Sequence, residues 1–218
     1  MVKRIAVGLM CIFFLVHNVS VIYGAVGCTL NDPDRDVRRL FPEATNYKTD
    51  FITIKERGGE ALAREVEEKL KDKLDTLYET IDAPYAYYTI LKKKEIIGYI
   101  HGVNQKGMFG GMQLILATTT EGEIIAFYYQ KISSPESKKF KDERFTDQFV
   151  GLTLADFYGH DDKVALISDP SENSHEDFVA TLRGTKKNLI LLDIFILDNK
   201  YDAVYNNSKG KEKDEDEK

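Results

Sequence analysis

The hydrophobic positions first follow a helical period. Between residues 60 and 81, apolar side chains recur at spacings of three and four, at Leu62, Val66, Leu70, Leu74, Leu77 and Ile81. This spacing predicts an amphipathic helix with one buried stripe and a solvated Glu/Lys-rich face. Before it, an Asp/Pro cluster predicts one or two helical turns within residues 31–42, and residues 50–55 are expected to form a strand.

The period then changes to one typical of strands. Residues 85–91, 95–103, 112–118 and 123–132 are β-branched and aromatic runs, separated by Lys-rich, Gly-rich and Glu-Gly segments. Four consecutive strands of this kind predict an antiparallel meander. One face of such a sheet must be covered by helices, and residues 60–81 and a helix near the carboxyl end are suited to do so.

Helical patterns return after the fourth strand. Residues 138–158 are expected to form one or two short helices with their phenylalanines inward, and residues 164–168 a short buried strand. Ser174 begins a longer helix with acids in its first turn, in which Gly184 marks a kink or a close-packing point. The predicted fold class is α+β, an antiparallel meander packed against an N-terminal amphipathic helix and a C-terminal helix.

The amino terminus has the pattern of an export signal. Residues 5–31 contain no charged side chain and follow Lys3 and Arg4, and small residues lie at 24, 25 and 27. Residues 1–27 therefore predict a secretory signal peptide or a retained membrane anchor, with cleavage favoured because polar residues interrupt the apolar run. Either places the protein outside the cytoplasm. Cys28 is a lipidation candidate, because Ala25-Val-Gly-Cys28 is similar to a lipobox; the alternative is an unpaired thiol in a flexible leader.

Length and charge limit the remaining organisation. The 218 residues suffice for one domain with appendages. We expect a helical lead-in at 31–83, a main domain at 84–205 and a disordered charged tail at 206–218. The formal net charge of −6 argues against binding nucleic acid through its phosphates.

Two loops carry candidate binding chemistry. Residues 105–111 read Gln-Lys-Gly-Met-Phe-Gly-Gly, and Gly107, Gly110 and Gly111 would let the backbone approach a flat or phosphorylated ligand, although a plain hairpin turn is an alternative. The second loop contains Ser133, Ser134 and Pro135, whose hydroxyls and amides suit the polar edge of a ring. No hydrolase elbow, Walker loop or helical metal-site histidine pair occurs, and His160-Asp-Asp162 lacks the oxygen cage of a cation loop.

The order of these pieces resembles a known family. A Gly98-Tyr99 strand, the glycine loop, a Glu-Gly-Glu turn, the Ser-Pro loop and Asp147-Gln-Phe-Val-Gly151 before a final helix are similar to the FMN-binding domain. That domain occurs in the G subunit of Rnf-type electron transport complexes and the C subunit of sodium-translocating NADH:quinone reductases. The resemblance covers roughly residues 86–197.

The resemblance implies a flavin site and also shows departures. It implies that the two loops line the site and that Gln148 and Phe149 match a Gln-Phe-x-Gly segment. The second loop reads Ser-Ser-Pro-Glu instead of Glu-Thr-Pro-Gly, and residues 162–168 keep an aspartate and Ser168 but lose the Ser-Gly-Ala-Thr motif of covalent members. We therefore expect no covalent attachment, since residues 164–167 also look buried. Ser168, Ser171, Ser174 and Thr185 are the outside candidates for attachment.

These observations lead to two functional hypotheses. The first is an exported electron-transfer domain that binds FMN non-covalently and serves a membrane or periplasmic redox partner, itself attached to the membrane if the amino terminus is retained. Lys106 or Lys138 would offset the phosphate charge. The alternative is a cofactor-free descendant of the fold that acts as a periplasmic binding or assembly module. A stand-alone enzyme would need a base, for which His101 is the one strand histidine.

Overall fold

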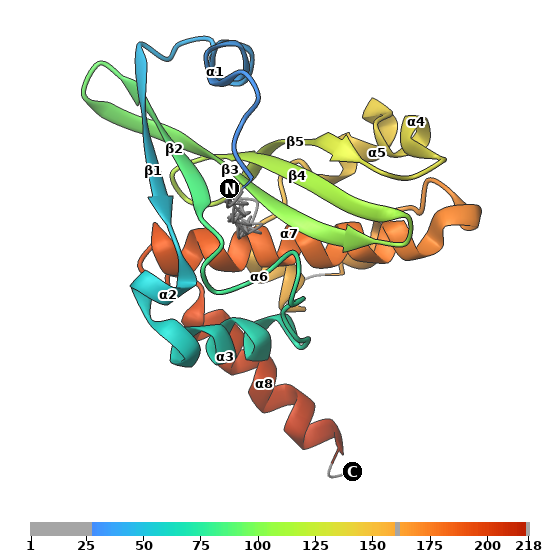
Figure 1. The fold of residues 1–218 in the computed structure, drawn as a ribbon. Helices are drawn as coiled ribbons and strands as arrows, with labels where there is room; N and C mark the ends of the chain where they lie inside the picture. Colours follow the sequence, from blue (N-terminus) through green and yellow to red (C-terminus); the bar gives the residue numbers. More distant parts are fainter. Residues whose placement is uncertain (1–27, 160–161, 217–218) are drawn as a thin grey trace, which may run out of the picture.

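The computed structural model describes residues 28–159 and 162–216 (Figure 1). Its strands are β1 (Asn46–Ile52), β2 (Tyr85–Lys92), β3 (Glu95–Gly107), β4 (Gly110–Thr118) and β5 (Ile124–Ile132). The helices are α1 (Pro33–Leu40), α2 (Ile54–Arg57), α3 (Gly59–Leu70), α4 (Ser137–Phe140), α5 (Glu143–Thr146), α6 (Leu154–Phe157), α7 (His175–Phe195) and α8 (Asp202–Asp216). Three short 3₁₀ turns complete the list: η1 (Asp147–Phe149), η2 (Val164–Leu166) and η3 (Glu172–Ser174).

The sheet is an antiparallel meander in which each strand pairs with its neighbour in sequence, in the order β1-β2-β3-β4-β5. The four predicted strands correspond to β2–β5, and the α+β fold class is confirmed. The first strand differs from the prediction of 50–55, because it begins at Asn46 and Thr53 caps α2 by accepting a hydrogen bond from Glu56 N–H. Since β1 pairs with β2, the segment expected to be a separate lead-in is part of the same sheet.

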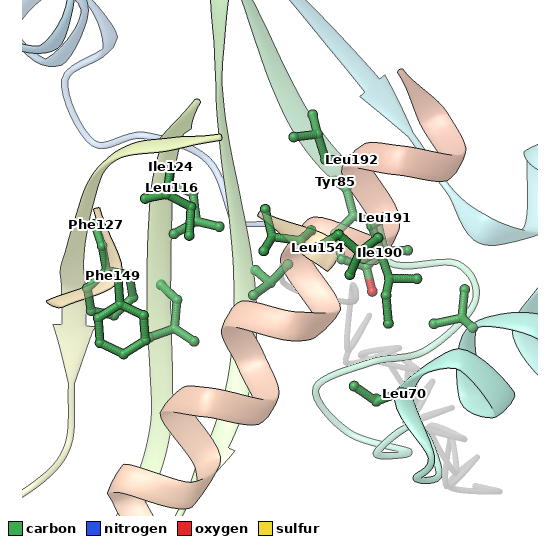
Figure 2. Close-up of a cluster of buried hydrophobic side chains, with 14 of the residues drawn as sticks. Leu70, Tyr85, Leu116, Ile124, Phe127, Phe149, Leu154, Ile190, Leu191 and Leu192 are labelled. Atoms are coloured by element: carbon green, nitrogen blue, oxygen red, sulfur yellow. The ribbon is translucent and has the colours of Figure 1, made fainter. Parts of the chain in front are cut away.

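The long helix α7 covers one face of the sheet (Figure 1). Its apolar residues meet those of β2–β5 and of the short helices in the larger core, where Ile190, Leu191 and Leu192 gather with Leu116 and Leu154 (Figure 2). Gly184 is a close-packing point, because a Cβ there would lie 2.2 Å from Leu114 Cδ1. The backbone of α7 therefore packs directly against the side chain of Leu114 in β4.

The opposite face of the sheet has a smaller core. Asp32 caps α1, accepting a hydrogen bond from Arg35 N–H at 3.1 Å, and Pro33 begins the helix. Val37 and Phe41 then pack on the sheet together with residues of the chain before the helix. The members of this cluster are Cys28, Leu30, Val37, Phe41, Ala86, Tyr88, Ile90, Ile100, Ile115 and Ala117. Both faces of the central strands are thus buried.

The predicted helix over residues 60–81 is wrong in its second half. The helix α3 ends at Leu70, where Lys71 has a φ of 60°, in the left-handed region. Beyond it, Asp75 accepts hydrogen bonds from Leu77 N–H and Tyr78 N–H, which stabilise a turn. Leu77 is 63% exposed, so the apolar spacing continues in sequence without continuing as a helix.

Two further segments differ from expectation. Residues 164–166 form the turn η2 instead of a strand, and the segment is only partly buried as assumed, because Leu166 is 76% exposed whereas Ile167 lies in the larger core. The charged segment expected to be disordered from residue 206 belongs to α8, which is docked by Tyr205 against Tyr158 and by an ion pair of Lys209 with Glu68. Instead of one or two short helices within 138–158, the structure has three of four residues each, α4, α5 and α6.

Candidate functional site

The glycine loop is a tight hairpin between β3 and β4. Gly107 pairs with Gly110, which leaves Met108 and Phe109 at the tip. A Cβ on Gly107 would lie 2.6 Å from Asp177 Oδ1, and one on Gly111 would lie 2.8 Å from the ring of Tyr78. The space beside these glycines is therefore occupied by the protein's own side chains.

The Ser-Pro loop lies beside this hairpin. Ser133 donates a hydrogen bond to the carbonyl of Gly111 at 3.1 Å, so the two predicted loops are indeed neighbours. Ser134 is buried, and its hydroxyl donates a hydrogen bond at 3.4 Å to the hydroxyl of Ser174, the residue just before α7. Pro135 is exposed. The loop thus joins the glycine hairpin to the amino-terminal end of α7.

Gln148 and Ser168 are in contact, although 20 residues separate them in sequence. The backbone N–H of Ser168 donates to Gln148 Oε1 at 2.8 Å, and Gln148 Nε2 donates to the carbonyl of Arg144 at 3.1 Å. Both residues line an open groove of about 500 Å³. Its lining residues are Lys139, Asp142, Arg144, Phe145, Gln148, Ser168, Asp169 and Pro170.

Phe149 does not line this groove. It is fully buried and stacks on Phe127 with ring centroids 4.3 Å apart, in the core shown in Figure 2. Its neighbour Phe145 meets it edge-to-face at 5.4 Å and forms part of the groove wall. The Gln-Phe pair is therefore divided between a polar groove residue and a core residue.

The groove carries charges of both signs. Arg144 forms two side-chain hydrogen bonds with Asp142, at 2.8 and 2.9 Å, and these lower the pKa of that carboxyl to about 2. Lys139 forms an ion pair with Glu136, which lowers the pKa of the glutamate. An incoming anion would have to compete with these carboxylates for the two cations.

The segment that leads into α7 closes one side of the groove. His175 Nδ1 lies 2.7 Å from Asp169 Oδ2, and the hydroxyl of Ser171 donates to Glu136 at 3.2 Å. The first contact stabilises the turn before α7, and the second holds this segment against Glu136 of the Ser-Pro loop. Among the outside candidates for attachment, Ser168 is exposed, whereas Ser174 and Thr185 are fully buried.

A buried charged network that sequence analysis missed lies under the hairpin. Lys187 of α7 is completely buried, forms an ion pair with buried Glu79, and donates to the carbonyl of Asn104 at 2.6 Å. Arg183 donates to Glu79 at 2.7 Å and to Gln105 at 2.8 Å. One signal in the sequence was the presence of a lysine and an arginine on the apolar helix at a spacing of four.

The pKa values within this network follow from burial and pairing. Burial lowers the pKa of Lys187 to about 8. Burial alone would raise the pKa of Glu79, but Lys187 and Arg183 together lower it. The network attaches residues 72–79 to α7, and a second groove of about 500 Å³, lined in part by Lys106, opens beside Arg183. Lys106 itself lies 3.6 Å from Asp75, and Lys138 is exposed outside the first groove.

Two other candidate residues are buried in the cores. His101 stacks on Tyr87 with centroids 4.0 Å apart, and burial lowers its pKa to about 3, so its imidazole is neutral at pH 7. Cys28 is 2% exposed and packs against Gly102 in the smaller core. Because Cys28 packs in this core, it does not belong to a flexible leader, and a lipid acceptor at this position would have to leave the core. Burial also raises the pKa of the thiol to about 12.

Other sequence predictions lie outside the described residues. The signal peptide or membrane anchor was predicted at residues 1–27, which the structure does not describe. Two of the three residues of the His160-Asp-Asp162 segment, 160 and 161, also lie outside the described part of the chain. In the part of the chain that the structure describes, no group of acidic, histidine and cysteine residues is arranged to hold a metal ion. None of the helices there is long and apolar enough to cross a bilayer.

The chain was compared with known proteins. No protein-family model matches it, and no curated protein is significantly similar to it. What the groove can do chemically must therefore be judged from its own residues: two cations, two carboxylates, an amide, a hydroxyl and one aromatic wall. The aromatic wall suits a flat apolar ligand with a polar edge, and an anionic group on that ligand would bind by replacing Asp142 or Glu136 as the partner of Arg144 or Lys139.

Proposed function

We propose that the protein is an exported electron carrier that binds FMN non-covalently in the groove between α5 and the segment before α7. The observation that carries the proposal is the hydrogen bond from Ser168 N–H to Gln148. The family resemblance assigned these two residues to different motifs of the flavin site, and both line one groove. When bound, FMN would supply the one- and two-electron chemistry, and the protein would bind and orient it.

The residues of the groove fit such a group in their chemistry. Lys139 and Arg144 would pair with the phosphate in place of Glu136 and Asp142, and the second N–H of Gln148 and the hydroxyl of Ser168 would contact the polar edge of the ring. Phe145 supplies an apolar wall. The volume of about 500 Å³ lies within the range of small-molecule sites. The glycine hairpin takes no part in this proposal, since Asp177 and Tyr78 fill the space beside Gly107 and Gly111.

Titration with FMN tests the proposal. We expect the protein to quench FMN fluorescence, and Arg144→Glu to weaken binding about tenfold or more, because a charge-assisted hydrogen bond contributes about 1.5–3 kcal/mol. The matched control is Lys141→Glu, which makes the same charge change on the same segment but lies in a different groove. The intact mass of the purified protein reports any covalent flavin and the state of the amino terminus.

A colourless protein that neither quenches FMN nor changes in melting temperature on adding it would support the second candidate function. This is a cofactor-free binding or assembly module, favoured by the covered faces of Gly107 and Gly111. In that case the groove of Lys139 and Arg144 would serve another anionic group or none.

A further inference from the structure

The two edges of the sheet differ in how they are protected. At one edge, β5 is covered in part by the chain that follows it: Gly151 N–H donates to the carbonyl of Ile124 at 2.8 Å, and Ile124 N–H donates to the carbonyl of Leu152 at 2.9 Å. At the other edge, β1 pairs only with β2 within residues 28–159 and 162–216 (Figure 1). Its outer backbone groups thus have no strand partner there.

The free edge is long and exposed for a sheet edge. β1 has seven residues, five of them exposed and none a proline, and Phe51 is 57% exposed. Natural proteins shield such edges, because unpaired backbone groups readily accept another strand. A strand added at this edge would pair with the outer backbone groups and cover Phe51.

The sequence of β1, Asn-Tyr-Lys-Thr-Asp-Phe-Ile, is complementary to itself when two copies run antiparallel about Thr49. In this register Lys48 of each copy lies opposite Asp50 of the other, and Tyr47 lies opposite Phe51. Opposite charges and aromatic pairs directly across an antiparallel ladder are stabilising. The two central threonines face one another, which is also a favourable pair.

The two faces of the sheet agree with this register. Tyr47 packs toward the smaller core and Ile52 toward the larger one, so Tyr47, Thr49 and Phe51 share the α1 face and Lys48 and Asp50 share the α7 face. Residues directly opposite in an antiparallel pair lie on the same face. The charged pairs would therefore form on one face and the aromatic pairs on the other.

We propose that the protein forms a symmetric homodimer by pairing β1 with β1 of a second copy, in the register centred on Thr49. The result is a continuous ten-stranded sheet in which each exposed Phe51 is covered by Tyr47 of the other copy. Since β1 and β5 are opposite edges, the groove of the proposed FMN site stays open.

Charge reversal tests both the dimer and its register. By analytical ultracentrifugation of the full chain, we expect a concentration-dependent dimer, and we expect Lys48→Asp or Asp50→Lys each to weaken it about tenfold, because both charged pairs become repulsive. An equimolar mixture of the two variants should form a heterodimer about as stable as the wild-type dimer, since every pair in it is again attractive. This rescue would not occur if either variant were merely misfolded.

A cysteine pair provides a second measurement. Thr49→Cys should form an intermolecular disulfide under mild oxidation, since the two copies of this position face one another. Asn46→Cys, at an exposed position on the same strand, should not, because it lies opposite Ile52 of the other copy. A wild-type chain that is monomeric at every accessible concentration, or a dimer unaffected by both charge reversals, would overturn the proposal.

Discussion

Two buried ionisable residues of α7, Lys187 and Asp193, have pKa values shifted away from their ordinary range. Lys187 is ionisable and completely buried, and its charge is tolerated there because Glu79 supplies a counter-charge and Asn104 a carbonyl. Removing one partner of such a pair costs much more than the pair contributes, since a buried charge is left alone. Asp193 differs, because among the described residues no cation forms an ion pair with it.

The carboxyl of Asp193 should make folding less stable as pH rises. Burial raises its pKa to about 6, from 3.8. The folded state therefore holds this proton more tightly, and the stability that it contributes is complete below about pH 4 and lost as pH rises through 6. Asp193→Asn cannot ionise, so we expect its stability not to fall over this pH range. The free energy of unfolding of the variant should exceed that of wild type by about 1–2 kcal/mol at pH 7 and should be close to it at pH 4.

Chemical denaturation at several pH values measures this difference. Asp198→Asn is the matched control, because Asp198 is exposed and has a left-handed backbone conformation that asparagine tolerates. If the difference between Asp193→Asn and wild type did not change between pH 4 and pH 7, the carboxyl would not titrate as its burial implies.

At the scale of elements, the fold depends on the close approach of α7 to the sheet. Helix α7 presents Gly184 to β4, and glycine is an unfavourable residue in a helix interior unless such an approach requires it. The groove proposed for FMN depends on the same helix, since Ser171 and Ser174 hold the segment before it against Glu136 and Ser134 of the Ser-Pro loop.

Gly184→Ala is expected to destabilise the protein by about 1–2 kcal/mol. The new methyl group would meet Leu114 at 2.2 Å and Gln105 at 3.1 Å in a packed core, and overpacking outweighs the gain in helix propensity. The control is Gly210→Ala in α8, where no heavy atom lies within 4 Å of the new Cβ and the propensity gain should stand alone. Equal effects of the two substitutions, measured by denaturant unfolding, would contradict direct packing of α7 on β4.

At the scale of the whole molecule, the sheet separates the proposed FMN-binding groove from the proposed dimer interface. The groove is lined by segments that follow β5 in the chain, and the proposed dimer forms at the β1 edge, with β2, β3 and β4 between these two strands. No shared residue connects the two sites, so they should act independently.

Lys48→Asp should therefore bind FMN with the affinity of the wild type, and Arg144→Glu should dimerise as the wild type does. Fluorescence titration and sedimentation on the same two preparations measure both quantities. A loss of FMN binding in the monomeric variant would show that the groove is completed by dimerisation, which the separation of the two edges does not allow.

The sequence alone determined those features that arise from local pattern. The alternation of apolar residues within 85–132 was enough for four strands and their antiparallel order, and the first-turn acids of α7 were enough for its start. Turn residues separate these strands at short distances, so neighbours in sequence become neighbours in space. The resemblance also pointed to Gln148 and Ser168, which the structure places together.

Only the tertiary structure decided which side chains fill which space. The spacing of Leu74, Leu77 and Ile81 favoured a longer helix, but Glu79 is drawn into the network with Lys187 and Arg183, and the turn at Asp75 replaces the helix. The glycines of the hairpin look like a ligand cradle in the sequence, yet Tyr78 and Asp177, distant along the chain, fill it. Local periodicity reports the face that a segment would bury, whereas long-range contacts determine what covers that face.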